Sequence, residues 1–177
     1  MNNKKTEKVI LGGGCFWCME ALYQAVNGVD KITSGYAGGN TPNPTYEMVC
    51  TGRTGHAEVV ELEFDPSVVS YEKILNLFWQ AHDPTTLNRQ GADSGTQYRS
   101  IIVCENDAQK AIAEKSKAEA QKNFKDPIVT EIVEGKPFFP SEKYHHNYYN
   151  QHPNEGYSQA VIEPKLEKFK KELKEQK

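Results

Sequence analysis

The sequence lacks any apolar run near the roughly 20 residues that a membrane-spanning helix requires. It also lacks an excess of basic charge, because 21 Lys and Arg residues are balanced by 24 Asp and Glu residues, and the formal net charge is -3. Chains that bind nucleic acid or anionic membranes through their overall field are usually strongly basic. The composition therefore argues against a membrane protein and against a nucleic-acid or membrane-surface partner.

The sequence also has few cysteines and no sign of a secretory leader. Segment 1–7 is polar and lacks the apolar centre of a signal peptide, so we expect a cytoplasmic protein. In a cytosolic chain of 177 residues, four cysteines fit catalytic, redox-active or buried roles better than a structural disulfide framework. The chain has no internal repeat, and its length suits one domain with its own core.

The most informative stretch is GGGCFWCME, residues 12–20. An apolar run leads into the glycines and a periodic segment follows, which predicts a strand, a tight turn and a helix that begins at Cys15. The free N–H groups and the dipole of a helix N-terminus stabilise a thiolate, so we expect the pKa of Cys15 to fall. Cys18 lies one helical turn further on, where its sulfur can reach that of Cys15. The pair therefore predicts a nucleophile with a resolving cysteine.

Two other classes of protein also carry closely spaced cysteines. A zinc-binding interaction module would need two further ligands, usually a second pair. Cys50 and Cys104 are solitary, and His145 and His146 are adjacent, so we expect no metal and interpret both solitary cysteines as small buried hydrophobes. A thioredoxin-like oxidoreductase places its CxxC motif after a strand and at a helix start as well, and this alternative stays open on the motif alone.

The order of the predicted elements indicates the fold class. Strands are predicted at 9–11, 29–36, 57–64, 98–104 and 128–133, and helices are predicted to begin near 16, 70, 106 and 164. This order predicts a two-layer α+β fold, a mixed sheet with helices packed on it. We expect a single domain over 1–177, with a core of about 8–155 and a C-terminal helix of about 163–174.

Three long segments are predicted to be irregular loops, 37–46, 85–96 and 137–149. Loops of this length in a compact domain usually carry function. Tyr46, Asp93 and Tyr98 lie in or beside the first two, where phenols close to a thiolate can hold a polar oxygen.

Glu58 is the candidate acid of the chain. In the strand predicted at 57–64 it shares a face with Val60 and Leu62, whereas Glu61 and Glu63 occupy the polar face. A carboxyl on a buried face has a raised pKa, which suits a general acid.

Phe16 and Trp17 are adjacent in the predicted helix, where neighbouring positions point about 100° apart. Both can hardly be buried on one stripe. We therefore expect one or both to face a site as a small apolar wall.

Together these motifs resemble the peptide methionine sulfoxide reductase A family. The resemblance rests on segments 13–17, 35–39, 42–46, 55–58, 78–79, 82–84, 89–93 and 95–100, and it covers roughly residues 8–155. It implies a ferredoxin-like α/β fold without metal or organic cofactor. It also implies reduction of the S epimer of methionine sulfoxide, free or in proteins, in repair of oxidised proteins.

The resemblance also assigns roles by position. Cys15 matches the nucleophile, and Phe16 and Trp17 match the pocket for the methyl group of the substrate. The groups that hold and protonate the sulfoxide oxygen match Tyr46, Glu58 and Tyr98, with Asp93 as a supporting carboxylate of the same site.

Recycling of the nucleophile departs from a common family pattern. Many members use cysteines in a C-terminal tail, but no cysteine follows Cys104 here. Cys18 stands where glycine is frequent, which resembles the subgroup whose resolving cysteine lies inside the GCFWC motif. We expect a sulfenic acid at Cys15, a Cys15–Cys18 disulfide, reduction of that disulfide by thioredoxin or another dithiol, and action as a monomer.

Overall fold

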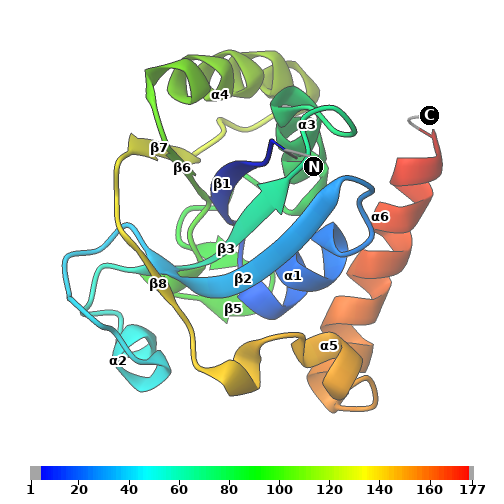
Figure 1. Cartoon of the computed structure of the whole chain (residues 1–177). Coiled ribbons are helices and arrows are strands. Elements are labelled where there is room, and N and C mark those ends of the chain that lie inside the picture. Colours follow the sequence, from blue (N-terminus) through cyan, green and yellow to red (C-terminus); the bar gives the residue numbers. More distant parts are fainter. Residues whose placement is uncertain (1–4, 176–177) are drawn as a thin grey trace.

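One mixed sheet forms the centre of the computed structural model, which describes residues 5–175. Its strands are β1 (Glu7–Gly12), β2 (Val29–Ala37), β3 (Ala57–Phe64), β6 (Ile101–Cys104), β7 (Glu131–Glu134) and β8 (Phe138–Pro140). Their order across the sheet is β7-β6-β1-β3-β2-β8 (Figure 1). Neighbouring strands are antiparallel except β6 and β7, which are parallel.

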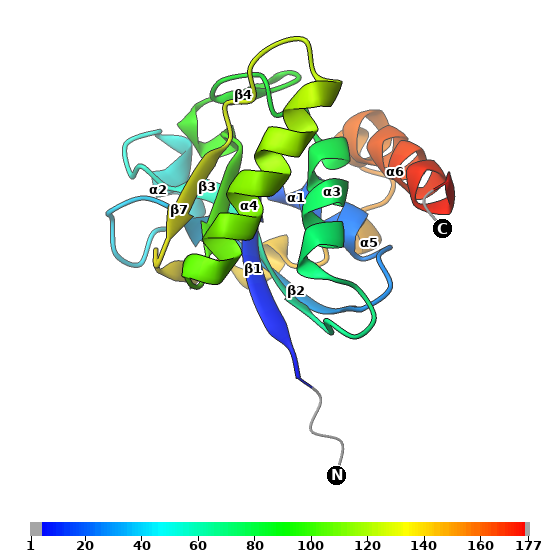
Figure 2. The same ribbon diagram turned by 90° about the horizontal axis from the view of Figure 1, so that it is seen from above.

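Four long helices pack with one face of this sheet into the main core. They are α1 (Phe16–Tyr23), α3 (Tyr71–Ala81), α4 (Asp107–Ala120) and α6 (Glu163–Glu175), and residues of all four belong to one apolar cluster. Figure 2 shows α3 between α4 and α6. The elements β1, α1, β2, β3, α3 and β6 form a ferredoxin-like unit, with β7 and β8 added at the two edges. The predicted two-layer α+β fold is confirmed.

Strand β3 shows why one face of the sheet is more exposed to solvent than the other. Val60 and Leu62 are fully buried under the helices. Glu61 and Glu63 alternate with them on the opposite face and form ion pairs with Lys8. The alternation predicted for 57–64 is therefore confirmed, with the same bounds.

The helix starts predicted near 70 and 106 are confirmed, whereas the helix predicted to begin at Pro164 continues from a π-helix, η4 (Ser158–Ile162), that directly precedes α6. The Ser70 hydroxyl accepts a hydrogen bond from the backbone of Lys73 at 3.0 Å, and the Asn106 side chain accepts one from Gln109 at 2.9 Å. These N-caps satisfy donors that the helix itself leaves free.

Several boundaries predicted from the sequence are wrong. Tyr98 ends a 3₁₀ turn, η1 (Thr96–Tyr98), and strand β6 begins only at Ile101. The strand predicted at 128–133 starts at Glu131, where pairing with β6 begins. Segment 85–96 contains a two-strand hairpin, β4 (Arg89–Gln90) and β5 (Asp93–Ser94).

Segment 137–149, which the sequence predicts to be irregular, contains strand β8 and the start of a short helix, α5 (Tyr148–Gln151). Strand β8 has three residues and ends in Pro140, which lacks an N–H group. Such a strand survives only at the edge of a sheet, where β8 pairs with β2. It is too short to show an alternating pattern in the sequence. No helix within residues 5–175 is long and apolar enough to cross a membrane.

Candidate active site

Cys15 lies at the entrance of α1, directly after the glycine turn. Gly14 has a φ of +99°, and a Cβ atom there would lie 2.7 Å from Cγ of Gln90. Only glycine meets both constraints without strain. The carbonyl of Cys15 accepts hydrogen bonds from the N–H groups of Cys18 and Met19 at 3.1 and 3.3 Å, which fixes the start of the helix. The side chain of Cys15 is 7% exposed.

The expectation of a lowered pKa at Cys15 is wrong for this structure. Burial raises the pKa of the thiol well above its ordinary value, and contact with Cys18 and the charge of Glu58 act in the same direction. The backbone hydrogen bond from Trp17 lowers the pKa. Its effect is smaller than that of burial, because a buried thiolate loses its hydration. The hydrogen bond from Cys15 in turn lowers the pKa of Cys18, which is 2% exposed. The two thiols are thus reduced and in contact.

Glu58 lies on the buried face of β3, as the alternation predicted, and is 1% exposed. Its Oε1 atom accepts a hydrogen bond from the backbone N–H of Phe16 at 3.2 Å, whereas Oε2 is buried and has no partner among the described residues. Burial raises the pKa of this carboxyl to about 8. The group is therefore mostly neutral at pH 7, with one oxygen available to donate a proton.

Phe16 and Trp17 point in different directions, as their adjacent positions on the helix require. Phe16 is fully buried, with its ring centroid 5.7 Å from that of Tyr36. Trp17 is only partly buried and stacks on Tyr148, with ring centroids 3.8 Å apart and planes 7° apart. The indole Nε1 donates a hydrogen bond to Nδ1 of His145 at 3.1 Å. Trp17 is therefore held in one orientation at the rim of the site.

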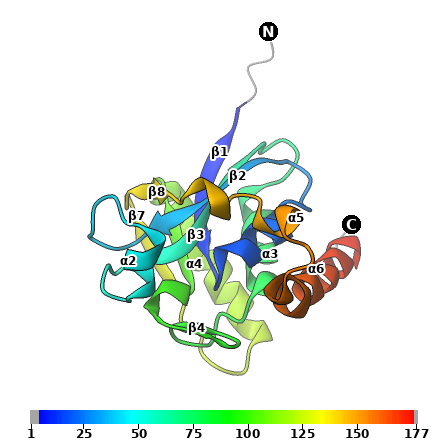
Figure 3. The same ribbon diagram turned by 90° about the horizontal axis from the view of Figure 1, so that it is seen from below.

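The loops bring the other predicted residues around the start of α1. Tyr46 is the first residue of the short helix α2 (Tyr46–Cys50), and its ring stacks near Phe16 at 6.5 Å. Tyr98 is half-buried, and its pKa is raised by burial and by the charges of Glu58 and Cys15. Asp93 begins strand β5. Seen from below, α2, β4 and α5 surround the blue segment that carries α1 (Figure 3).

Sequence reasoning missed a third part of the site, segment 141–157. Its Tyr157 donates a hydrogen bond to Oδ2 of Asp93 at 2.7 Å and lies 3.8 Å from the sulfur of Cys18. Its Glu142 accepts hydrogen bonds from the Tyr36 hydroxyl and the Tyr46 backbone, both at 3.0 Å. The density of aromatic and histidine residues in 137–149 was a visible signal, but no motif marked Tyr157.

The two solitary cysteines differ from each other. Cys104 is buried, as predicted, and its sulfur lies 3.7 Å from the Tyr71 hydroxyl. Cys50 is exposed, so the prediction that it is buried is wrong. Cys50 is the last residue of α2, and this helix of five residues is too short to bury it. Its thiol contacts the Tyr46 side chain. Within residues 5–175, no group of three or more His, Cys, Asp or Glu side chains could hold a metal ion.

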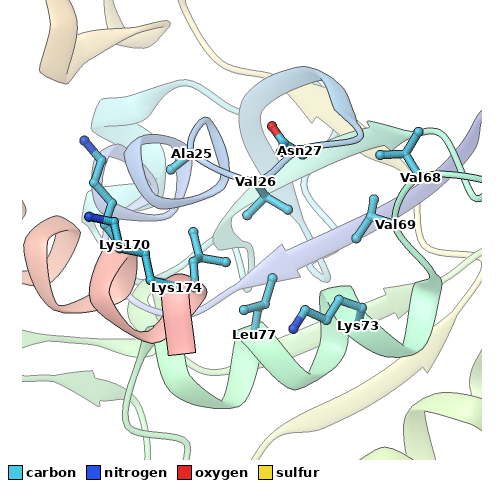
Figure 4. Close-up of a pocket in the computed structure, with 10 residues that line it drawn as sticks. Ala25, Val26, Asn27, Val68, Val69, Lys73, Leu77, Lys170 and Lys174 are labelled. Atoms are coloured by element: carbon cyan, nitrogen blue, oxygen red, sulfur yellow. The ribbon is translucent and has the colours of Figure 1, made fainter. Parts of the chain in front are cut away.

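A separate hollow of about 570 Å³ lies near the other end of α1 (Figure 4). It is lined by Ala25, Val26, Asn27, Val68, Val69, Lys73, Leu77, Lys170, Leu173 and Lys174. No residue of the predicted site belongs to this lining, and it holds neither a cysteine nor a carboxylate. The predicted site residues therefore lie outside this hollow.

Comparison with known proteins gives consistent matches. The model of a family described as "Peptide methionine sulfoxide reductase" matches residues 7–177. "Peptide methionine sulfoxide reductase MsrA" of Polynucleobacter asymbioticus is 54% identical over 170 residues, which cover 95% of this chain and 90% of the relative. The protein of the same name from Nitratiruptor sp. is 56% identical over 164 residues, covering 93% and 94%.

Solved structures agree with these relatives. Mxr1 from Saccharomyces cerevisiae in its reduced form has a TM-score of 0.82 at 34% identity, covering 87% of this chain and 90% of that one. The structure of Mxr1 in complex with Trx2 has a TM-score of 0.61 at 25% identity, covering 81% and 86%.

Proposed function

The chain belongs to the peptide methionine sulfoxide reductase family and reduces methionine sulfoxide, and we propose that it does so with Cys15 as nucleophile and Glu58 as proton donor. The proposed substrate is the S epimer, free or in oxidised proteins. The observation that carries this assignment is the neutral Glu58 carboxyl, whose free oxygen lies in the buried site at the start of α1. A general acid needs this combination of a retained proton and an open direction of donation.

In the first step, the sulfur of Cys15 attacks the sulfur of the sulfoxide. Glu58 gives a proton to the sulfoxide oxygen and regains the proton that Cys15 loses, so the carboxyl ends the step neutral. The S–O bond of the substrate breaks, and the released hydroxide attacks the sulfur of Cys15. The bond between the two sulfurs then breaks, so that methionine leaves and Cys15 carries the oxygen as a sulfenic acid. Tyr46 and Tyr98 flank the site as hydrogen-bond donors that hold the oxygen, and Asp93 supports them.

Phe16 and Trp17 form the apolar wall against which the methyl group of the substrate rests. Trp17 is fixed by its stack on Tyr148 and by its hydrogen bond to His145. A methyl group on this wall and an oxygen on Glu58 leave one direction for the sulfur lone pair. This arrangement supports selection of one epimer.

In the second step, Cys18 condenses with the sulfenic acid and a Cys15–Cys18 disulfide forms. The contact between the two thiols supports this pairing. We propose thioredoxin as the reductant, because the related Mxr1 has been solved in complex with Trx2. We also propose that the chain acts in the cytoplasm as a single-domain monomer that needs no metal or organic cofactor.

The test is a thioredoxin-coupled assay with each epimer of methionine sulfoxide, on the wild type, Cys15→Ser and the matched control Cys104→Ser. Only the S epimer should be consumed, and Cys15→Ser should form no methionine even in a single turnover with excess enzyme. Cys104→Ser should behave as the wild type because Cys104 is buried away from the site. Methionine formation by Cys15→Ser, or equal consumption of both epimers, would contradict the proposal.

A further inference from the structure

The sulfur of Cys18 lies 3.8 Å from the hydroxyl of Tyr157, and that hydroxyl donates a hydrogen bond to the carboxylate of Asp93. We propose that Tyr157 and Asp93 form a proton relay that activates the Cys18 thiol when it condenses with the sulfenic acid on Cys15. This inference rests on the proposed function and concerns its second step.

The relay follows from the direction of two hydrogen bonds. The Tyr157 hydroxyl lies 2.7 Å from Oδ2 of Asp93 and 3.8 Å from Sγ of Cys18. A phenol has one hydrogen, and a carboxylate can only accept. Once the hydrogen points to Asp93, the Tyr157 oxygen can only accept a hydrogen bond from the Cys18 thiol. The chain of donors therefore runs from Cys18 through Tyr157 to Asp93.

Condensation needs such a path because one proton must move from the Cys18 thiol to the departing oxygen inside a buried site. The sulfur–sulfur bond forms, the S–O bond of the sulfenic acid breaks, and the oxygen leaves as water. The thiolate is the reactive form of Cys18, so its proton must first leave. It passes to Tyr157 while the Tyr157 proton passes to Asp93. The relay then returns one proton to the departing oxygen, because the Tyr157 hydroxyl also reaches Cys15.

The other ionisable groups near Cys18 cannot serve as the base. Lys165 of α6 acts on Cys18 through its charge, but an ammonium has no free acceptor for a proton. Glu58 is neutral after the first step, and its Oε1 is occupied by Phe16. Cys15 is the partner of the reaction itself. Among the described residues that face Cys18 from α1, β3, β5 and α6, only Asp93 is a carboxylate linked to it by hydrogen bonds.

Tyr157 touches the reacting sulfur and is therefore a catalytic residue of this step, whereas Asp93 acts through it as a positioning residue. The experiment mixes reduced enzyme with excess methionine-S-sulfoxide without reductant. It follows methionine by chromatography, sulfenic acid by a carbon nucleophile trap, and thiol loss by alkylation. The variants are Tyr157→Phe and Asp93→Asn, with Tyr149→Phe as the matched control on α5.

The quantity compared between the proteins is the rate constant for conversion of the sulfenic acid into the disulfide. This step is followed separately because either variant can also slow the reduction of the sulfoxide. We expect Tyr157→Phe to slow disulfide formation by roughly 10²-fold, at the lower end of general acid–base contributions. The rate in this variant should rise about tenfold per pH unit from pH 6 to 8, because thiolate must then form through solvent. The wild-type rate should rise less steeply. Asp93→Asn keeps an oxygen for Tyr157 but cannot take its proton, so it should show the same steep pH profile.

A purely structural role for Asp93 predicts no change in the slope with pH, because Asn preserves the hydrogen bond. An unchanged slope in both variants would overturn the relay while one methionine per enzyme still upheld the reductase assignment. A wild type that forms no methionine would overturn the proposed function itself. If a variant does not fold, the wild type in D₂O decides: disulfide formation should slow there, and an unchanged rate would also overturn the relay.

Discussion

Replacing Glu58 by Gln should stabilise the protein at neutral pH while it removes most of the reductase activity. Burial raises the pKa of Glu58 from 4.5 to about 8, so the folded chain keeps this proton at pH 7 and the unfolded chain does not. One pKa unit corresponds to about 1.4 kcal/mol. Through this group alone, the free energy of unfolding therefore decreases by on the order of 3 kcal/mol as the pH rises from 4.5 to 7.

The direction of the effect follows from the number of bound protons. Between pH 4.5 and 8 the unfolded state binds fewer protons than the folded state, so the free energy of unfolding decreases as the pH rises. Below pH 4.5 both states are protonated and the contribution disappears. A Gln side chain does not ionise, and its amide oxygen can still accept the hydrogen bond from Phe16.

The measurement is urea unfolding of the reduced protein at several pH values from 5 to 8, for the wild type and Glu58→Gln. The difference in unfolding free energy should grow by on the order of 3 kcal/mol across this range. Pairing the two proteins cancels the other titrating groups. The variant should also reduce methionine-S-sulfoxide more slowly, by roughly 10²–10⁴-fold in a single turnover.

Glu63→Gln is the matched control, because Glu63 lies on the same strand, faces the other side and pairs with Lys8 and Lys31. It should keep the wild-type rate of reduction. A difference between Glu58→Gln and wild type that stays constant from pH 5 to 8 would show that Glu58 is ionised in the folded protein. That result would refute its role as proton donor at neutral pH.

Three further predictions concern the cysteines. Cys18→Ser should form about one methionine per enzyme and then stop as a sulfenic acid, because only the first cysteine is needed for the sulfoxide chemistry; normal cycling with thioredoxin would contradict this. In the wild type, alkylation and peptide mapping after excess sulfoxide should find one new disulfide, Cys15 to Cys18, and a disulfide that contains Cys50 or Cys104 would disprove the recycling scheme. Elemental analysis of the reduced protein should find far less than one zinc per chain, since the cysteine pair has no second ligand pair; a value near one would overturn this.

The parts of the fold that could be predicted are those with local signals. The glycine turn before Cys15 is forced by backbone conformation, and the face of Glu58 is set by the two-residue period of β3. Ser70 and Asn106 mark helix starts because a side-chain oxygen there satisfies free N–H groups. Each of these features depends on residues within a few positions of one another.

The pKa of Cys15 shows where local reasoning ends. The helix start is visible in the sequence, and its effect on a thiolate has a known sign. Burial of the same thiol depends on distant segments, and the charge that opposes ionisation comes from Glu58, 43 positions away in the chain. Both effects were larger than the local one, so the predicted direction was wrong. The prediction that Cys50 is buried is wrong for a related reason, because the segments that pack over a short helix determine its exposure.

Segment 141–157 is the strongest case of this kind, because none of its contacts with the site can be inferred from spacing. It reaches the cysteines only because Ser141 pairs with β2 through a backbone hydrogen bond to Ser34, and because Glu20 of α1 accepts a hydrogen bond from the backbone of Tyr148. Those two anchors hold the segment across the start of α1. With both anchors in place, Tyr157 lies between Asp93 and Cys18 and contacts both. It thereby links the carboxylate predicted to support substrate binding with the cysteine predicted to resolve the sulfenic acid.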